Sequence, residues 1–144
     1  MATNLSEARL IDLPFFPDSR GELSVVQFPE QLPFVPVRTF FVSRVPSEST
    51  RGEHAHRECH QAILCVNGAM TVTVEDRLGV RSFRLKSLSK MLYIPPGVWA
   101  AQDGYGKDTA CAVFASHPYD PADYVRDYGN WRREYGLKEI ENHS

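Results

Sequence analysis

The chain has 144 residues, 42% of them hydrophobic and 24% charged, a composition that predicts a single globular domain over residues 1–144. Its 16 basic and 18 acidic residues give a formal net charge of −2, so no overall positive field exists to attract a nucleic acid. No stretch approaches the roughly 18 apolar residues of a membrane span, the first residues lack the order of a signal peptide, and three cysteines without Cys-x-x-Cys spacing favour reduced thiols in a cytoplasmic protein.

Short β-type runs recur along most of the chain. They fall at 8–13, 23–28, 37–42, 62–66, 70–75, 80–85, 91–94 and 110–115. The strongest turn signal is Asn67-Gly68, which favours a two-residue hairpin between the runs on either side. Several prolines in the first third argue against long helices there. This pattern predicts an all-β fold, an antiparallel jelly roll.

Helix is expected only near the C-terminus. Asp120 before Pro121 gives a capping residue followed by proline at the first helical position, and Gly129 can end that helix. Asn130 offers a second cap for residues 131–135. We therefore expect short C-terminal helices, whose aromatic side chains pack them on the β domain or on a second subunit.

Three histidines stand just ahead of the run at 62–66. They are His54, His56 and His60, at positions i, i+2 and i+6. Alternate residues of an extended chain share one face, so the three imidazoles are expected on one wall if no bulge intervenes. Neutral imidazole suits zinc, iron or copper, and it also exchanges protons near neutral pH. The motif therefore predicts either a metal site or an acid/base site.

The histidine segment and the turn at 93–100 together resemble the paired motifs of the cupin superfamily, which implies a cupin-type jelly roll, or double-stranded β-helix. Metal-binding cupins carry an acidic residue where this chain has His60, and a histidine where it has Ala100. These two departures favour a site without metal.

A more specific resemblance covers residues from about 18 to 131. The matching segments are DSRG at 18–21, RGEHAHR at 51–57, Gln61, CVNG at 65–68, IPPGVW at 94–99, ASHPYD at 115–120 and DYVRDY at 123–128. They are similar to the nucleotide-sugar 3,4-ketoisomerases, metal-free cupins that act on dTDP-4-keto-6-deoxyglucose. The resemblance implies an isomerase that forms a dTDP-3-keto-6-deoxyhexose through an enediol, without a cofactor. It implies a role in deoxysugar biosynthesis, as for lipopolysaccharide O-antigens, and a homodimer with exchanged N-terminal strands.

Acid/base chemistry is assigned jointly to His54 and His56, with His54 preferred as the base. The 4-keto group acidifies the hydrogen on C3, and an imidazole pKa of about 6.5 leaves both base and acid forms available at neutral pH. Arg51, aided by Arg20, is expected to hold the diphosphate with its fork of donors. His60 is expected to support the site rather than react. The other expected substrate-binding residues are Arg38, Gln61, Tyr93 and Trp99.

One departure from the family bears on mechanism. Its members carry tyrosines on the strand where this chain has Phe40 and Phe41. Core packing is the favoured interpretation of that pair. If the reaction uses the missing hydroxyl, water or another residue must replace it.

Three other functions are compatible with the sequence. A nucleotide-sugar epimerase on the same fold would use similar histidines. A metal-dependent cupin would need His54, His56 and His60 as ligands, and a non-catalytic module would bind the nucleotide sugar without turnover. The base of the nucleotide and the configuration of the product at C4 stay open.

Overall fold

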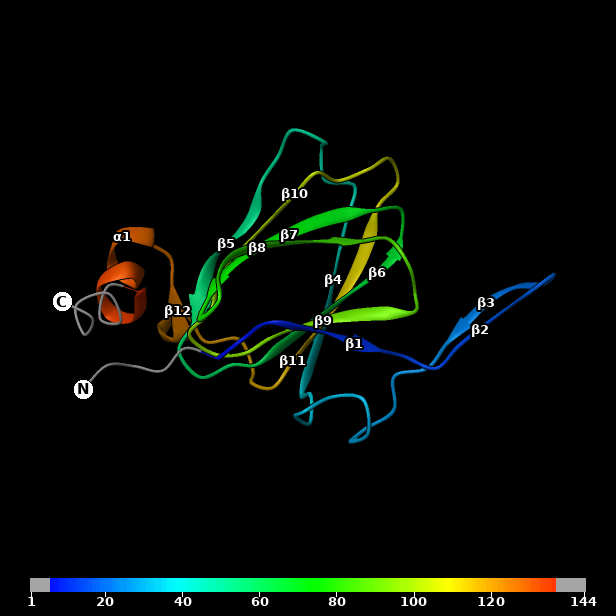
Figure 1. Ribbon diagram of the computed structural model, residues 1–144, viewed down its shortest axis with the longest axis horizontal. Coiled ribbons are helices and arrows are strands. Elements are labelled where there is room, and N and C mark those ends of the chain that lie inside the picture. The colour runs from blue at the N-terminus through cyan, green and yellow to red at the C-terminus, as the bar shows by residue number, and fades with distance from the viewer. Residues whose placement is uncertain (1–5, 137–144) are drawn as a thin grey trace.

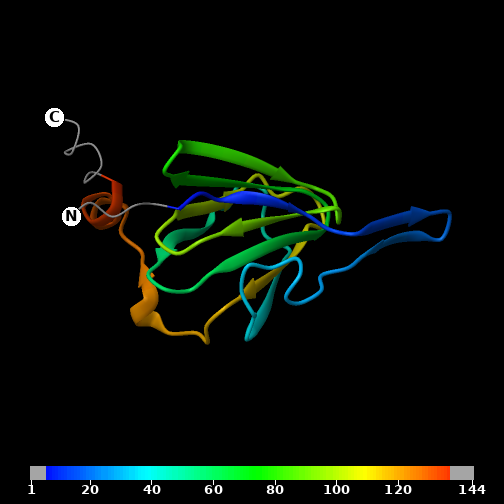
Figure 2. The same ribbon diagram turned by 60° about the horizontal axis from the view of Figure 1, so that its bottom comes forward.

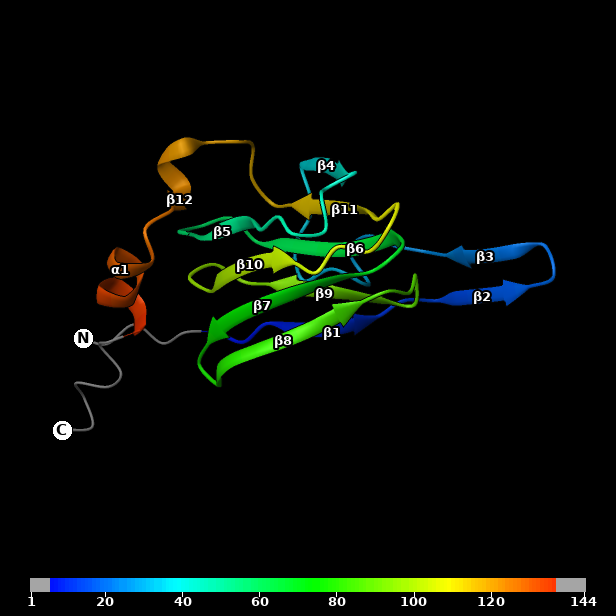
Figure 3. The same ribbon diagram turned by 90° about the horizontal axis from the view of Figure 1, so that it is seen from above.

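The computed structural model describes residues 6–136, and within them two five-stranded antiparallel sheets face each other (Figures 1 and 3). The first sheet has the order β1 (Arg9–Asp12), β9 (Lys90–Ile94), β6 (Gln61–Asn67), β11 (Ala110–Ala115) and β4 (Arg38–Ser43). The second has the order β12 (Tyr124–Val125), β5 (Arg51–His56), β10 (Trp99–Asp103), β7 (Met70–Asp76) and β8 (Gly79–Leu85). The expected antiparallel jelly roll of cupin type is confirmed.

A separate hairpin of β2 (Phe15–Asp18) and β3 (Gly21–Ser24) extends beyond the two sheets, as Figures 1 and 2 show. The sequence predicted a strand at 23–28 but not β2. At the other end of the domain lie a 3₁₀ turn at Pro121–Asp123, the helix α1 (Tyr128–Trp131) and a π-helical turn at Arg132–Gly136. No helix in residues 6–136 is long and apolar enough to cross a membrane.

The C-terminal segment differs from its prediction. Asp120 is the N-cap residue as expected, and its side chain accepts the backbone N–H of Ala122. Only one 3₁₀ turn follows, however, before the chain enters β12. β12 then pairs with the edge of β5, which would otherwise expose unpaired backbone groups. Asp127, rather than Asn130, caps α1. Sheet pairing thus replaces the longer helix that local signals predicted.

The main core lies between the sheets, and a second cluster lies outside the first sheet. In β6, Ile63 and Cys65 belong to the core between the sheets, whereas Ala62 and Leu64 belong to the outer cluster with Leu32. Both faces of β6 are therefore covered, which explains its continuous apolar run. The same alternation decides on which side the neighbouring polar residues fall.

A third cluster attaches the C-terminal helix to the outer face of the second sheet. It contains Ala55, Val125 and the fully buried Trp131, with Trp99 packed against them. The indole N–H of Trp131 donates to the carbonyl of Gly97 at 2.8 Å. The helix therefore fixes the turn before β10 and, through Val125, the position of β12.

The Asn67-Gly68 turn does not close the expected hairpin, because β6 and β7 belong to different sheets and the turn carries the chain from one sheet to the other. Gly68 has φ +76°, and a Cβ there would lie 2.8 Å from the Cα of Thr109. Gly79, in the next turn, has φ +98° with no atom within 4 Å of its Cβ position. Gly79→Ala should cost only the backbone strain, about 1–2 kcal/mol. Gly68→Ala should cost clearly more, because it also displaces Thr109.

Urea unfolding of the two variants and of the wild type measures this difference. Equal losses of unfolding free energy would show that the contact with Thr109 adds nothing.

Candidate active site

A cavity of about 260 Å³ lies where β4, β5, β6, β10 and the segment of β12 come together. Its polar lining includes Arg51, His54, Gln61, Gln102, Tyr124 and Arg126. The site is thus assembled from both sheets and from residues up to 86 positions apart in the sequence (Phe40 to Arg126).

His54 and His56 face this space because Ala55 between them faces the outer cluster. Their ring centroids are 4.8 Å apart with an edge-to-face arrangement. Ala100 lies directly opposite His54 in the register of β10 and β5, and it belongs to the core between the sheets. A methyl group therefore stands where a metal-binding cupin would place an imidazole.

A bulge in β5 brings Arg51 to the same side as His54. The register advances by two residues on β10, from Ala100 to Gln102, but by three on β5, from His54 to Arg51. Gly52 has φ +66°, a conformation that glycine adopts without strain. Without the extra residue Arg51 would face outward, so the bulge aims the guanidinium into the cavity.

His60 does not join the other two histidines. The chain bends after β5, and His60 then follows the alternation of β6, which puts it on the outer face. Its Nδ1 lies 2.7 Å from the hydroxyl of Tyr93, and its ring contacts Phe34 at 5.6 Å between centroids. The expectation of one wall with three imidazoles is therefore wrong for His60, and the three-histidine metal site is not assembled.

Asp123 is the partner of His56. Its Oδ2 lies 2.8 Å from Nδ1 of His56, and its Oδ1 accepts the backbone N–H of Glu58 at 2.7 Å. Because a carboxylate only accepts, Nδ1 must carry the hydrogen, which leaves the lone pair on Nε2. Nε2 is buried and has no hydrogen-bond partner among the described residues. His56 thus presents an unpaired basic nitrogen.

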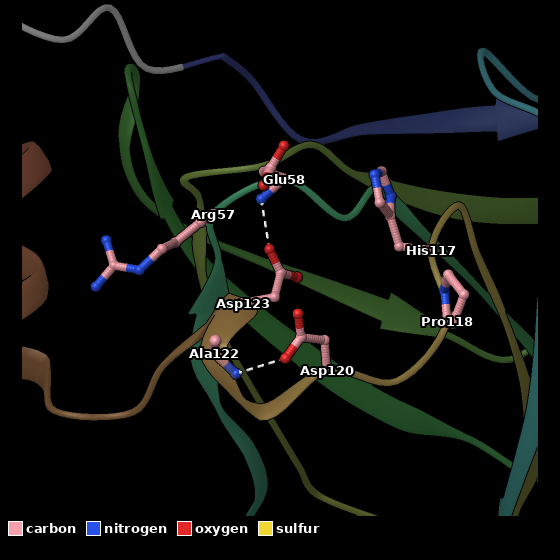
Figure 4. A pocket seen from close by; sticks show the side chains of 7 residues that line it. All are labelled: Arg57, Glu58, His117, Pro118, Asp120, Ala122 and Asp123. Carbon is pink, nitrogen blue, oxygen red and sulfur yellow. Dashed lines mark hydrogen bonds between the residues drawn. The ribbon is translucent and has the colours of Figure 1, made fainter.

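A second pocket of about 290 Å³ lies on the far side of Asp123 (Figure 4). Arg57, Glu58, His117 and Asp120 help to line it, and Figure 4 shows the Asp123 carboxylate directed toward the backbone of Glu58. Asp123 therefore contacts His56 on one side and lines this second pocket on the other.

The two imidazoles are neutral at physiological pH. The pKa of His54 is lowered to about 4, chiefly by burial and also by interactions with His56 and Arg126, which Asp123 partly offsets. Burial also lowers the pKa of His56, against the opposing effect of its hydrogen bond to Asp123. The acid form of His54 at pH 7 is therefore only about one molecule in a thousand. The expectation that both forms are abundant is wrong for His54.

Asp123 stays ionised. Burial alone would raise the pKa of its carboxyl, but hydrogen bonds from His56 and from the backbone of Glu58 and Cys59 outweigh burial and lower it. An ionised acceptor beside a neutral imidazole is the arrangement that strengthens the base when it takes up a proton.

His56, Cys59 and Asp123 also form a cluster of candidate metal ligands, whose ligand atoms lie within 4.8 Å of one another. The 2.8 Å between Nδ1 of His56 and Oδ2 of Asp123 is a hydrogen-bond distance. Tetrahedral zinc would hold a nitrogen and an oxygen ligand about 3.4 Å apart. This pair therefore fits a proton better than a metal ion.

Of the expected binding residues, Arg51 and Gln61 line the cavity. Arg38 lies close by, with its guanidinium carbon 5.2 Å from the ring centre of Phe40, and its charge helps to lower the pKa of His56. Arg20 pairs with Asp18 at the turn of the β2–β3 hairpin and does not line the cavity of its own chain.

Tyr93 and Trp99 face away from the cavity. Tyr93 lies on the outer side of the first sheet, and Trp99 packs against Trp131 with 5.9 Å between ring centroids. Each directly precedes a residue that faces inward, Ile94 and Ala100 respectively. The assignment of Tyr93 and Trp99 to the site of this chain is therefore wrong, because strand alternation places their side chains on the opposite face.

Phe40 and Phe41 have different environments. Phe40 lines the cavity and packs against the core, whereas Phe41 is 76% exposed because β4 is the edge of its sheet. Core packing is thus the wrong interpretation for Phe41. The cavity wall at Phe40 carries no hydroxyl.

Sequence reasoning did not assign Asp123, Tyr124, Arg126 or Gln102 to the site. The first three belong to the DYVRDY segment, whose tyrosines were expected only to pack helices. The polar and charged side chains of this short β-type segment could have indicated a role in the site. Its pairing with β5, however, is a long-range contact that local sequence does not reveal.

The low pKa of His54 predicts a pH-dependent stability. The unfolded chain, with an ordinary pKa of 6.5, binds a proton more readily than the folded one, whose pKa is about 4. The free energy of unfolding should therefore fall as pH drops from 6.5 toward 4. His54→Asn removes this contribution and should lose less stability over that range. Urea titrations of both proteins measure it, and identical pH profiles would contradict a buried neutral His54.

Comparison with known proteins identifies the family. The family model "FdtA: WxcM-like, C-terminal" matches residues 6–136. A TDP-4-oxo-6-deoxy-alpha-D-glucose-3,4-oxoisomerase from Aneurinibacillus thermoaerophilus is 32% identical over 127 residues, which cover 88% of this chain and 91% of that protein.

Solved structures give the same answer. The 3,4-ketoisomerase QdtA from Thermoanaerobacterium thermosaccharolyticum, a histidine-to-asparagine mutant in complex with TDP-4-keto-6-deoxyglucose, matches with a TM-score of 0.85 at 28% identity, covering 90% of this chain and 94% of that chain. The TDP-quinovose 3,4-ketoisomerase WlaRB from Campylobacter jejuni matches with a TM-score of 0.81 at 25% identity, covering 88% and 97%. This chain therefore belongs to the FdtA, WxcM-like family of dTDP-sugar 3,4-ketoisomerases.

Proposed function

We propose that this chain converts dTDP-4-keto-6-deoxyglucose to a dTDP-3-keto-6-deoxyhexose. The observation that carries the proposal is the pair of neutral imidazoles, His54 and His56, beside a cavity that also holds Arg51 and Arg126. The relative from A. thermoaerophilus is an isomerase of this TDP-linked keto sugar. Moving a keto group between adjacent carbons requires a neutral base beside a sugar-sized site, and the cavity has both.

The base for C3 is His54, because it lines the cavity while His56 lies deeper and is 5% exposed. Removal of the C3 proton gives the enediolate and an imidazolium on His54. Ionised Asp123, hydrogen-bonded to the adjacent His56, helps to stabilise that positive charge. The imidazolium then returns a proton to C4, so no metal or redox group is needed.

The size of the cavity limits how the substrate sits. A volume of about 260 Å³ is below the range of roughly 300–1,000 Å³ typical for drug-sized ligands, so it holds the sugar ring and leaves the nucleotide at the mouth. Arg51 and Val42 also line a neighbouring surface pocket of about 490 Å³ that includes Arg44. We assign the diphosphate to this junction, with Gln61 and Gln102 oriented toward sugar hydroxyls.

Incubation of the purified protein with dTDP-4-keto-6-deoxyglucose, followed by proton NMR, tests the function. A product with the keto group at C3 is expected. A 4-keto epimer would identify an epimerase instead, and binding without turnover would identify a binding module.

His54→Asn and His56→Asn should each fold and lose turnover roughly 10²–10⁴-fold, because Asn cannot exchange a proton near neutral pH. Solvent deuterium exchange at C3 isolates the abstraction step, and His54→Asn should abolish it. His117→Asn is the matched control, because His117 does not line the cavity. If both site variants turned over at close to the wild-type rate, the assignment of catalysis to His54 and His56 would be wrong.

We also infer a homodimer. Val35, Val37 and Phe41 are 65%, 61% and 76% exposed at and before the edge strand β4. The extended hairpin exposes Phe16 and Leu23, and an isolated two-stranded hairpin is marginally stable in water. Two copies that exchange these hairpins would bury both surfaces.

The hairpin is the segment that we assign to exchange. The first expected strand, 8–13, forms β1, which pairs with β9 of its own chain. Exchange of the hairpin would carry Arg20 to the partner subunit. Arg20 could then bind the diphosphate in the partner's site, although it does not reach the cavity of its own chain.

Light scattering at micromolar concentration should give about twice the chain mass of 16.3 kDa. Phe41→Asp should shift the protein toward the monomer, because a carboxylate at the centre of an apolar interface is costly to desolvate. Val80→Asp is the control, since Val80 is also exposed, at 68%, but lies on β8. A wild-type mass of one chain would contradict the dimer.

A cytoplasmic location is part of the same proposal. Cys59, Cys65 and Cys111 are free and buried, which suits a reducing compartment. The product would serve the synthesis of deoxysugars, such as those of O-antigens.

A further inference from the structure

Tyr124 brings a phenol to the two histidines. It lies in register with His56 across β12 and β5, on the face that lines the cavity. Its ring centroid is 4.4 Å from that of His56 and 5.0 Å from that of His54. Its hydroxyl makes no hydrogen bond to any residue between 6 and 136, and it is not among their buried unpaired polar atoms. The hydroxyl is therefore free to bind a ligand.

The proposed isomerisation requires a proton on oxygen as well as on carbon. The carbonyl oxygen O4 must gain a proton when the enediol forms, and the hydroxyl oxygen O3 must lose one when the new ketone forms. Neutral His54 uses its unprotonated ring nitrogen for the C3 proton, Asp123 is ionised, and the Nδ1 proton of His56 is held by Asp123. Phe40, on the same cavity wall, has no hydroxyl.

We propose that the Tyr124 hydroxyl carries the proton between O4 and O3, a role that rests on the proposed function. His54 takes the proton from C3 while the C3–C4 double bond forms and O4 takes the phenolic proton. The phenolate then removes the O3 proton as the C3 carbonyl forms, and C4 takes the proton back from His54. Every group returns to its starting state, so no other reactant is consumed.

Arg126 supports this role of Tyr124. Its guanidinium carbon lies 4.2 Å from the centre of the Tyr124 ring, and both residues line the cavity. A fixed positive charge over the ring stabilises the negative charge that develops on the phenolate. Arg126 thus acts on the transient state that the proton shuttle requires.

Tyr124→Phe is the direct test, because it keeps the ring contacts with both histidines and with Arg126 and removes only the hydroxyl. We expect kcat to fall roughly 100-fold or more, with the Kd for dTDP and the unfolding midpoint unchanged. Tyr119→Phe is the matched control: its ring lies 5.7 Å from that of Tyr124, but it does not line the cavity, and it should turn over normally.

A second readout separates proton transfer from a structural role. Replacing Tyr124 by 3,5-difluorotyrosine makes the phenol more acidic at nearly constant shape, so the alkaline limb of the kcat–pH profile should move to lower pH. An unmoved limb, or a Tyr124→Phe variant with wild-type kcat, would overturn the proposal while leaving the isomerase function intact. A wild-type protein without turnover would instead overturn the function itself, and the role of Tyr124 with it.

Discussion

The hydrogen bond between His56 and Asp123 is the contact on which the site depends. It joins residues 67 positions apart, and the side chain of His56 is 5% exposed while that of Asp123 is 13% exposed. A hydrogen bond to a charged group contributes about 1.5–3 kcal/mol, and loss of one partner would leave a poorly hydrated charge. The same bond fixes the tautomer of His56 and the position of β12. Tyr124 and Arg126 reach the cavity only because β12 is held there.

Strand alternation then sorts the remaining residues into those that face the substrate and those that face the outer clusters. Gln61 faces inward, whereas its neighbour His60 faces outward. In the same way Ala100 faces inward and its neighbour Trp99 faces outward. The bulge at Gly52 breaks this rule once, and there it adds Arg51 to the cavity. A deletion in this short segment would move the arginine without touching the histidines.

The sequence predicted well what is encoded locally. The jelly roll follows from short apolar runs with turn signals, and the inward His54–His56 pair follows from strand alternation. The Asn67-Gly68 turn forms where it was expected, but it joins strands of different sheets, so the predicted hairpin is wrong. β5 and β10 were missing from the expected strands, because functional side chains replace the apolar alternation in RGEHAH and WAAQD. Tyr93 was assigned to the site only from the family pattern, which does not reveal the face on which a side chain lies. Asp123 and Tyr124 depend on the long-range register of β12, which no local pattern contains.

The burial that creates the site also determines what the chemistry demands. A dry environment lowers the pKa of His54 to about 4, so the base is always available but holds a proton weakly. A weak base can remove a carbon-bound proton only if the negative charge that forms on the substrate oxygen is stabilised as it appears. Most of the barrier must therefore be lowered at O4 rather than at C3, by a donor beside the histidine pair. Asp123, on the other side of His56, stabilises the positive charge that the same step creates. The site thus separates charge between two fixed partners, and the weakness of its base is the reason that both are needed.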